Sequence, residues 1–138
     1  MAFLTLPAIE NGLALWGGGF KLDVLRNAEW LRACDVYYWG DLDAHGFIML
    51  SRLRSFLPQA TSVMMDVETF ETFRAFAVSG TPSETTALPN LTPSEQAVFQ
   101  SLARNNLRLE QERISHDYVK ERLGYRHHSG SGLTMMFL

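Results

Sequence analysis

Hydrophobic residues along the chain alternate between short continuous runs and longer segments with apolar residues at every third or fourth position. The short runs are residues 13–16, 36–39 and 61–65. The longer segments are residues 21–33, 47–57 and 68–77. Short apolar runs are typical of buried strands, and the longer spacing is typical of amphipathic helices. The alternation of the two predicts an α/β fold with a mostly parallel sheet flanked by helices.

The second half of the chain is predicted to begin with a loop and then to be mainly helical. Residues 79–91 are rich in Ser, Thr, Pro and Gly, which indicates an exposed loop. Residues 92–95 have the pattern of a capping box with proline at the first helical position, so a helix should span residues 93–105. A short apolar run at residues 107–109 precedes a last helix over residues 115–124.

Length and composition indicate one globular domain. The chain has 138 residues, of which 46% are hydrophobic and 20% charged, and this suits a single core. We expect a domain over residues 1–124 and a C-terminal tail over residues 125–138. The tail is expected to be a loose extension whose apolar end packs on the core or on a neighbouring chain.

Net charge, cysteine content and the length of the apolar stretches indicate which partners and which compartment to expect. The net charge of −3 provides no global positive field, so contact with DNA would depend on local patches or on a partner. Cys34 is the single cysteine, which fits a reducing compartment. No apolar stretch is long enough to span a membrane, so a cytoplasmic location without membrane contact is expected.

Two carboxylates follow the aromatic run. Asp41 and Asp43 are two positions apart, so in an extended segment their side chains point to the same side, at the strand end where α/β sheets bind ligands. Carboxylates held this close repel each other unless a cation lies between them, and oxygen ligands suit Mg²⁺. The pair predicts a Mg²⁺ or Mn²⁺ site that handles phosphate. The alternative is a solvated turn in which one aspartate caps the next helix.

Other polar residues are weaker candidates. Glu110 and Glu112 could join the same site if they face the aspartate pair, although such a polar run is usually a solvated surface. His45 could orient a phosphate or lie in the first turn of a helix, and Asp66 could share the sheet edge or cap a helix. Glycines 17–19 could present backbone N–H groups to phosphate, but a structural turn is favoured. A possible DNA-backbone patch comprises Arg104, Arg108, Arg113, Lys120, Arg122 and Arg126.

Four motifs in a consistent order resemble one known family. They are WGGGF at residues 16–20, YWGDLDAHGF at 38–47, MMD at 64–66 and LEQERI at 109–114. Together they resemble the C-terminal domain of the Wadjet JetD protein, the nuclease subunit of a bacterial anti-plasmid defence system. The resemblance covers residues 3–124. That domain is similar to the Rossmann-like Toprim fold of topoisomerases, and most closely to the A subunit of the type IIB enzymes.

The resemblance implies Mg²⁺-dependent cleavage of DNA phosphodiester bonds, with Asp41 and Asp43 matching the Asp-x-Asp metal ligands of the family. The implied partners are DNA and the SMC-type subunits of the system, and a homodimer is a further option. The family's first strand ends in a Glu-Asn pair that the match places before the first residue of this chain. The Glu-Asn pair at residues 10–11 lies too close to the run at residues 13–16 to replace it. We therefore expect the first strand and its glutamate to be missing.

Two alternatives remain open beside the nuclease. The first is a catalytically inactive interaction module that keeps the fold and the partner surface. The second is another Mg²⁺-dependent phosphate-handling enzyme that uses Asp-x-Asp, such as a sugar-nucleotide transferase. An upstream strand ending in Glu-Asn would favour the nuclease, and its absence would favour the module.

Overall fold

The main sheet of the computed structural model comprises strands β1 (Gly12–Trp16), β2 (Asp35–Trp39), β3 (Thr61–Ser62) and β6 (Leu133–Phe137). The strand order is β1-β6-β2-β3, and every neighbouring pair is parallel. This confirms the predicted α/β class with a parallel sheet. The structure describes residues 12–16, 26–33, 35–80, 83, 87–126 and 133–137.

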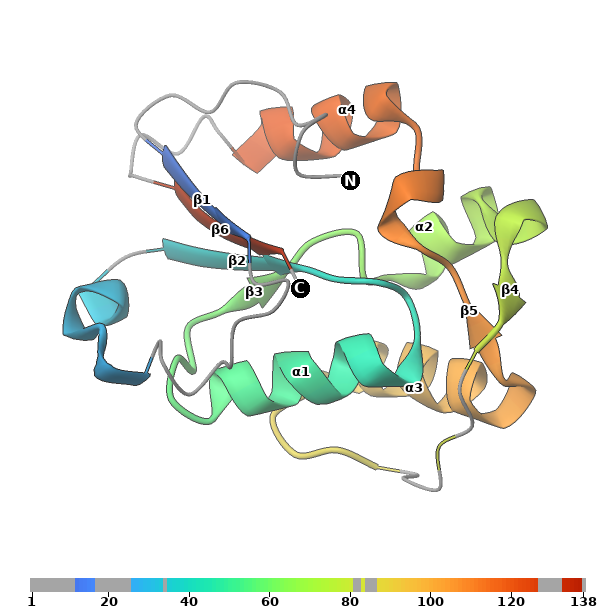
Figure 1. The fold of residues 1–138 in the computed structure, drawn as a ribbon, viewed down its shortest axis with the longest axis horizontal. Helices are drawn as coiled ribbons and strands as arrows, with labels where there is room; N and C mark the ends of the chain where they lie inside the picture. Colours follow the sequence, from blue (N-terminus) through green and yellow to red (C-terminus); the bar gives the residue numbers. More distant parts are fainter. Residues whose placement is uncertain are drawn as a thin grey trace.

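Strand β6 lies between β1 and β2, although it comes last in the chain (Figure 1). It pairs with β1 over Gly12–Trp16 and with β2 over Asp35–Trp39. The sequence allows for an apolar end of the tail that packs on the core, but it does not predict that residues 133–137 form a strand within the sheet. The reason is that parallel strands are joined by long connections, so the local sequence does not reveal the partners of a strand. The domain boundary at residue 124 stays a prediction.

Within the described residues the α-helices are α1 (Ala44–Arg54), α2 (Val67–Thr72), α3 (Pro93–Asn105) and α4 (His116–Arg126). The first two begin at aspartates that act as N-caps. An oxygen of Asp43 accepts a hydrogen bond from the Gly46 N–H at 2.6 Å, and an oxygen of Asp66 accepts one from the Thr69 N–H at 2.8 Å. Such caps satisfy backbone donors that the first turn leaves unpaired.

The predicted helix over residues 93–105 has the bounds observed for α3, and the predicted capping box is present. The Thr92 hydroxyl accepts from the Glu95 N–H at 3.2 Å, and the Thr92 N–H donates to a Glu95 carboxylate oxygen at 2.8 Å. Asn106 ends the helix in the left-handed conformation, with φ of 50°. These signals are local, which explains why the sequence located this helix correctly.

Short 3₁₀ helices and a small antiparallel sheet complete the described part of the fold. The 3₁₀ helices are η3 (Glu29–Ala33), η4 (Arg74–Phe76) and η5 (Gln111–Arg113). In place of a continuous helix over residues 68–77, α2 ends at Thr72, its C-cap Phe73 has φ of −111°, and η4 follows. Strands β4 (Val78–Ser79) and β5 (Leu107–Arg108) pair antiparallel. Helix α4 runs two residues beyond the predicted end at Gly124.

The core lies between the sheet and its helices. Phe47, Leu50 and Leu53 of α1 and Phe99 of α3 are fully buried, and the ring centroids of Phe47 and Phe99 are 6.1 Å apart. Figure 1 shows α1 and α3 on one side of the sheet and α4 on the other. Each such side chain contributes about 1.5–3 kcal/mol by leaving water. The described helices include none that is both long enough and apolar enough to cross a bilayer.

Candidate functional site

The candidate site lies where the chain leaves the carboxyl end of β2. Beyond Trp39, Leu42 forms an isolated antiparallel bridge with Leu109. The two residues exchange backbone hydrogen bonds of 2.9 and 3.0 Å, and both side chains are fully buried. Because alternate side chains of an extended segment point to opposite faces, the neighbours of these leucines on both segments project away from the core.

The neighbours that project away from the core are Asp41, Asp43, Arg108 and Glu110. Nη2 of Arg108 lies 3.3 Å from Oδ2 of Asp41, and Nε lies 3.5 Å from Oδ2 of Asp43. Nη2 is also 3.9 Å from Oε1 of Glu110. The carboxylates of the predicted aspartate pair thus converge on one guanidinium, and the structure brings Glu110 to the same place.

Gln111 fixes the position of Asp41. Its backbone N–H donates to Oδ1 of Asp41 at 2.9 Å, and its side-chain amide donates to the carbonyl oxygen of Trp39 at 2.6 Å. Gln111 is itself buried. These two bonds hold η5 against the end of β2, so Asp41 cannot turn away without breaking a partly buried hydrogen bond.

Gly46 allows α1 to pack closely against the same loop. A Cβ atom at this position would lie 2.1 Å from the carbonyl oxygen of Asp41. The carbonyl oxygen of Gly46 accepts a hydrogen bond from the buried Tyr38 hydroxyl at 2.7 Å. Burial raises the pKa of Tyr38, and the charges of Asp43 and Asp41 raise it further. The phenol therefore stays protonated and keeps donating this bond.

The surroundings of Asp41 disfavour its ionised form. Burial is the largest influence on its pKa and raises it. The negative charges of Asp43 and Glu112 raise the pKa further. The hydrogen bond from Gln111 and the charge of Arg108 lower it, but the net pKa is above the ordinary value. Ionised Asp41 therefore costs folding free energy, which a bound cation would offset.

This pKa predicts that Asp41→Asn stabilises the cation-free domain at neutral pH. Because the folded-state pKa is raised, the folded chain holds the proton more tightly than the unfolded chain, and wild-type stability falls as pH rises through that pKa. Asparagine carries no charge and can still accept from Gln111. Urea unfolding at pH 4 and pH 7.5 should show the advantage of the variant growing with pH. An advantage that shrinks with pH would contradict the assignment.

The oxygen chemistry of the site fits a hard divalent cation. Asp41 and Asp43 supply two carboxylates, and Mg²⁺ commonly binds one or two carboxylates and keeps waters. Among the described residues no group of three or more His, Cys, Asp or Glu side chains is arranged to hold a metal. Glu110 reaches the pair through Arg108, whereas Glu112 is exposed and acts on Asp41 through its charge.

Other candidates from the sequence lie elsewhere or have structural roles. His45 is exposed in the first turn of α1. Asp66 caps α2 and lies 3.6 Å from Arg122 in an ion pair, so its alternative interpretation as a cap is confirmed. Glycines 17–19 and the Glu-Asn pair at residues 10–11 lie outside the described residues.

Sequence reasoning missed two residues of the site, Arg108 and Gln111. In the sequence, Arg108 stands out only as one of the basic residues in the last third of the chain. The available signal is the alternation of apolar and charged residues over residues 107–110, which indicates one buried and one solvent-facing side of an extended segment. For Gln111 we find no comparable local signal, because its contacts are set by the distant loop after β2.

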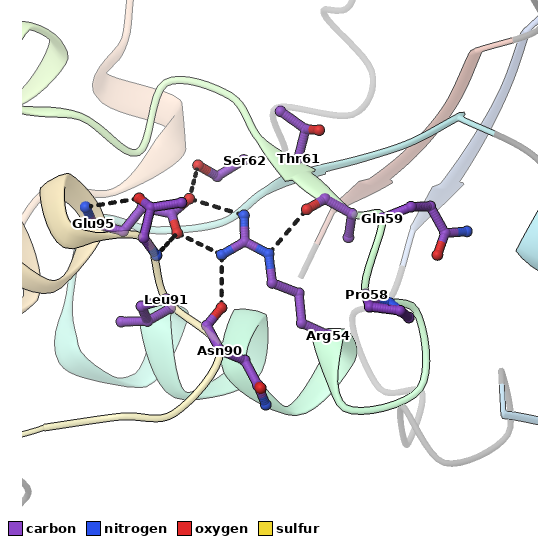
Figure 2. A pocket seen from close by; sticks show the side chains of 10 residues that line it. Arg54, Pro58, Gln59, Thr61, Ser62, Asn90, Leu91 and Glu95 are labelled. Carbon is purple, nitrogen blue, oxygen red and sulfur yellow. Dashed lines mark hydrogen bonds and ion pairs between the residues drawn. The ribbon is translucent and has the colours of Figure 1, made fainter.

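An open pocket of about 430 Å³ holds a second polar cluster (Figure 2). Arg54 donates to both carboxylate oxygens of Glu95 and, at 2.9 Å each, to the carbonyl oxygens of Ala60 and Asn90. The Ser62 hydroxyl also donates to Glu95. Burial alone would raise the pKa of Glu95, but these hydrogen bonds hold it below its ordinary value. The charges are satisfied within the protein, so the cluster serves to join α1, β3 and α3.

Comparison with known proteins agrees with the motifs at the site. The family model described as "Wadjet protein JetD, C-terminal" matches residues 1–123, a span that includes β2, the aspartate pair and the segment that carries Arg108. No curated protein matches the chain. The chain therefore belongs to the family of the C-terminal part of the Wadjet protein JetD.

Proposed function

We propose that this domain provides the Mg²⁺-binding part of a DNA-cleaving site. Family membership gives the chain a role in Wadjet anti-plasmid defence, within a multi-subunit system. The observation that supports the proposal best is the convergence of the Asp41 and Asp43 carboxylates on one positive charge at the carboxyl end of β2. DNA and the SMC-type subunits of the system are the proposed partners.

In this proposal Asp41 and Asp43 hold the cation, and backbone N–H groups orient them. The Gln111 N–H fixes one oxygen of Asp41, and the Gly46 N–H fixes one oxygen of Asp43. When bound, Mg²⁺ supplies stabilisation of the charge that develops on a phosphate oxygen. Glu110 and Glu112 are second-rank candidates to accept the proton of the attacking water or to add a ligand.

The proposal predicts that Asp43→Asn and Asp41→Asn each weaken binding of Mn²⁺ or Mg²⁺ by about tenfold or more, because each removes a charged ligand. Both variants should fold, since asparagine is a good N-cap and keeps an acceptor oxygen. Isothermal titration of the 138-residue chain measures the affinity. Asp117→Asn, an exposed carboxylate of α4, is the matched control and should bind as the wild type does.

Cleavage is tested separately with supercoiled plasmid and Mg²⁺. We expect little nicking by this chain alone, because an aspartate pair holds a cation but strand cleavage also needs a positioned base or a further ligand. Vigorous nicking that Asp41→Asn abolishes would instead show that residues of this chain, with Glu110 as the first candidate, complete the site.

The ion pairs of Arg108 favour a second candidate, the inactive interaction module. In that case Arg108 neutralises Asp41 and Asp43 permanently, and the loop is only a structural element. The titration separates the two candidates, since the module should bind neither Mn²⁺ nor Mg²⁺ at the aspartate pair.

A further inference from the structure

Arg108 occupies the carboxylate oxygens that a cation would need. Oδ1 of Asp41 accepts from the Gln111 N–H, and Oδ1 of Asp43 accepts from the Gly46 N–H. The Oδ2 atom of each aspartate faces the Arg108 guanidinium, at 3.3 and 3.5 Å. The backbone therefore engages one oxygen of each carboxylate and leaves the other for a positive charge.

A divalent cation held by Asp41 and Asp43 would compete with Arg108 for the same two oxygens. Mg²⁺ binds carboxylate oxygens at about 2.0–2.1 Å, and the residues that would hold it, Asp41 and Asp43, already contact the Arg108 guanidinium. A divalent cation and a guanidinium that contact the same carboxylate oxygens are close together, and their positive charges repel each other strongly. Cation binding would therefore weaken the contacts of Arg108 with both aspartates and favour a position of the guanidinium farther from them.

Arg108 is placed so that it can move. Its side chain is 42% exposed, compared with 25% for Asp41 and 15% for Asp43. Its backbone stays fixed, because β5 pairs with β4 and the next residue, Leu109, bridges to Leu42. A displaced guanidinium would thus remain beside the aspartate pair, with its planar fork of donors free for an anion. Such a fork matches the oxygens of a phosphate.

We propose that Arg108 is the displaceable counter-ion of Asp41 and Asp43, and that a divalent cation releases it to bind a phosphate of the DNA backbone. The inference rests on the proposed function and adds a residue and an order of events to it. Before the cation binds, Arg108 lowers the repulsion between the aspartates. After the cation binds, the same side chain offers its positive charge to the DNA phosphate.

The first test is the affinity for Mn²⁺, measured by titration of the full chain without DNA. Arg108→Gln should bind Mn²⁺ about tenfold more tightly than the wild type, because no resident cation has to leave. Arg108→Lys keeps a positive charge and should stay near the wild type. Arg74→Gln removes an equal charge from an exposed ion pair with Glu71 and should change nothing.

The second test is binding of a short fluorescent DNA duplex. Arg108→Gln should weaken it about tenfold when Mg²⁺ is present and have little effect when Mg²⁺ is absent, since Arg108 is then held by the aspartates. Arg74→Gln is again the control, and circular dichroism confirms that each variant is folded.

The outcomes separate this inference from the proposed function. If the wild type and Arg108→Gln bind Mn²⁺ equally well, the cation site stands and the displacement of Arg108 is refuted. An equal loss of DNA binding with and without Mg²⁺ would refute the release of Arg108 by the cation. If neither protein binds Mn²⁺, the proposed function fails, and the inference fails with it.

Discussion

Replacing Glu95 by alanine is expected to lower the free energy of unfolding by about 3–5 kcal/mol, the usual effect of removing one partner of a buried ion pair. The Glu95 side chain is only 7% exposed, and that of Arg54 is 10% exposed, so the substitution leaves a guanidinium buried without its counter-charge. It also removes the hydrogen bond from the Thr92 N–H to the Glu95 side chain, which is one half of the capping box of α3. Urea unfolding followed by circular dichroism measures the loss, which is a large part of the stability of an ordinary domain.

Glu71→Ala is the matched control for Glu95. It breaks an ion pair with Arg74 in which both side chains are more than half exposed, and exposed pairs contribute about 0–1 kcal/mol.

The lowered pKa of Glu95 predicts that its contribution to stability depends on pH. A carboxylate with a lowered folded-state pKa stabilises above its unfolded pKa and loses this effect as pH falls. Equal losses for Glu71→Ala and Glu95→Ala would refute the structural role of the cluster.

Gly46→Ala is expected to destabilise the domain by about 1–3 kcal/mol, in the range of overpacked positions. Alanine normally favours a helix over glycine by about 1 kcal/mol, but here the added Cβ would lie 2.1 Å from the Asp41 carbonyl oxygen. That oxygen belongs to the backbone, so the loop or the start of α1 must shift. The shift should also weaken Mn²⁺ binding, because it moves Asp41 relative to Asp43.

His45→Ala provides the comparison for Gly46. His45 precedes Gly46 in the same helix and is exposed, so its replacement should leave both unfolding and Mn²⁺ titration close to the wild type. If Gly46→Ala were as stable as His45→Ala, the close approach of α1 to the loop after β2 would be wrong. If it lost stability but kept the Mn²⁺ affinity, the loop would adapt without disturbing the aspartate pair.

The features that the sequence predicted correctly depend on nearby residues. The bounds of α3 follow from a cap, a proline and a helical repeat that lie within one segment. Strand β2 and the position of the aspartates after it follow from an aromatic run with an abrupt polar end. The spacing of Asp41 and Asp43 predicts that their side chains point the same way, and in the structure both carboxylates contact Arg108.

The features that the sequence missed depend on residues far apart in the chain. Arg108 reaches the pair because Leu42 and Leu109 bridge two segments that no periodicity connects. The pairing of β6 with β1 and β2 likewise joins distant strands. A hydrophobic repeat states which side of a segment is buried, but not which segment covers it.

The central place of β6 has a consequence for the order in which the domain assembles during synthesis. Strands β2 and β3 can pair as soon as both have left the ribosome, but β1 has only β6 as its described neighbour in the sheet. Until residues 133–137 emerge, β2 presents an open edge, and unpaired edges invite pairing with other chains. The domain therefore depends on the insertion of β6 to fill the gap between β1 and β2, and a delay in that step would prolong the interval in which it can aggregate.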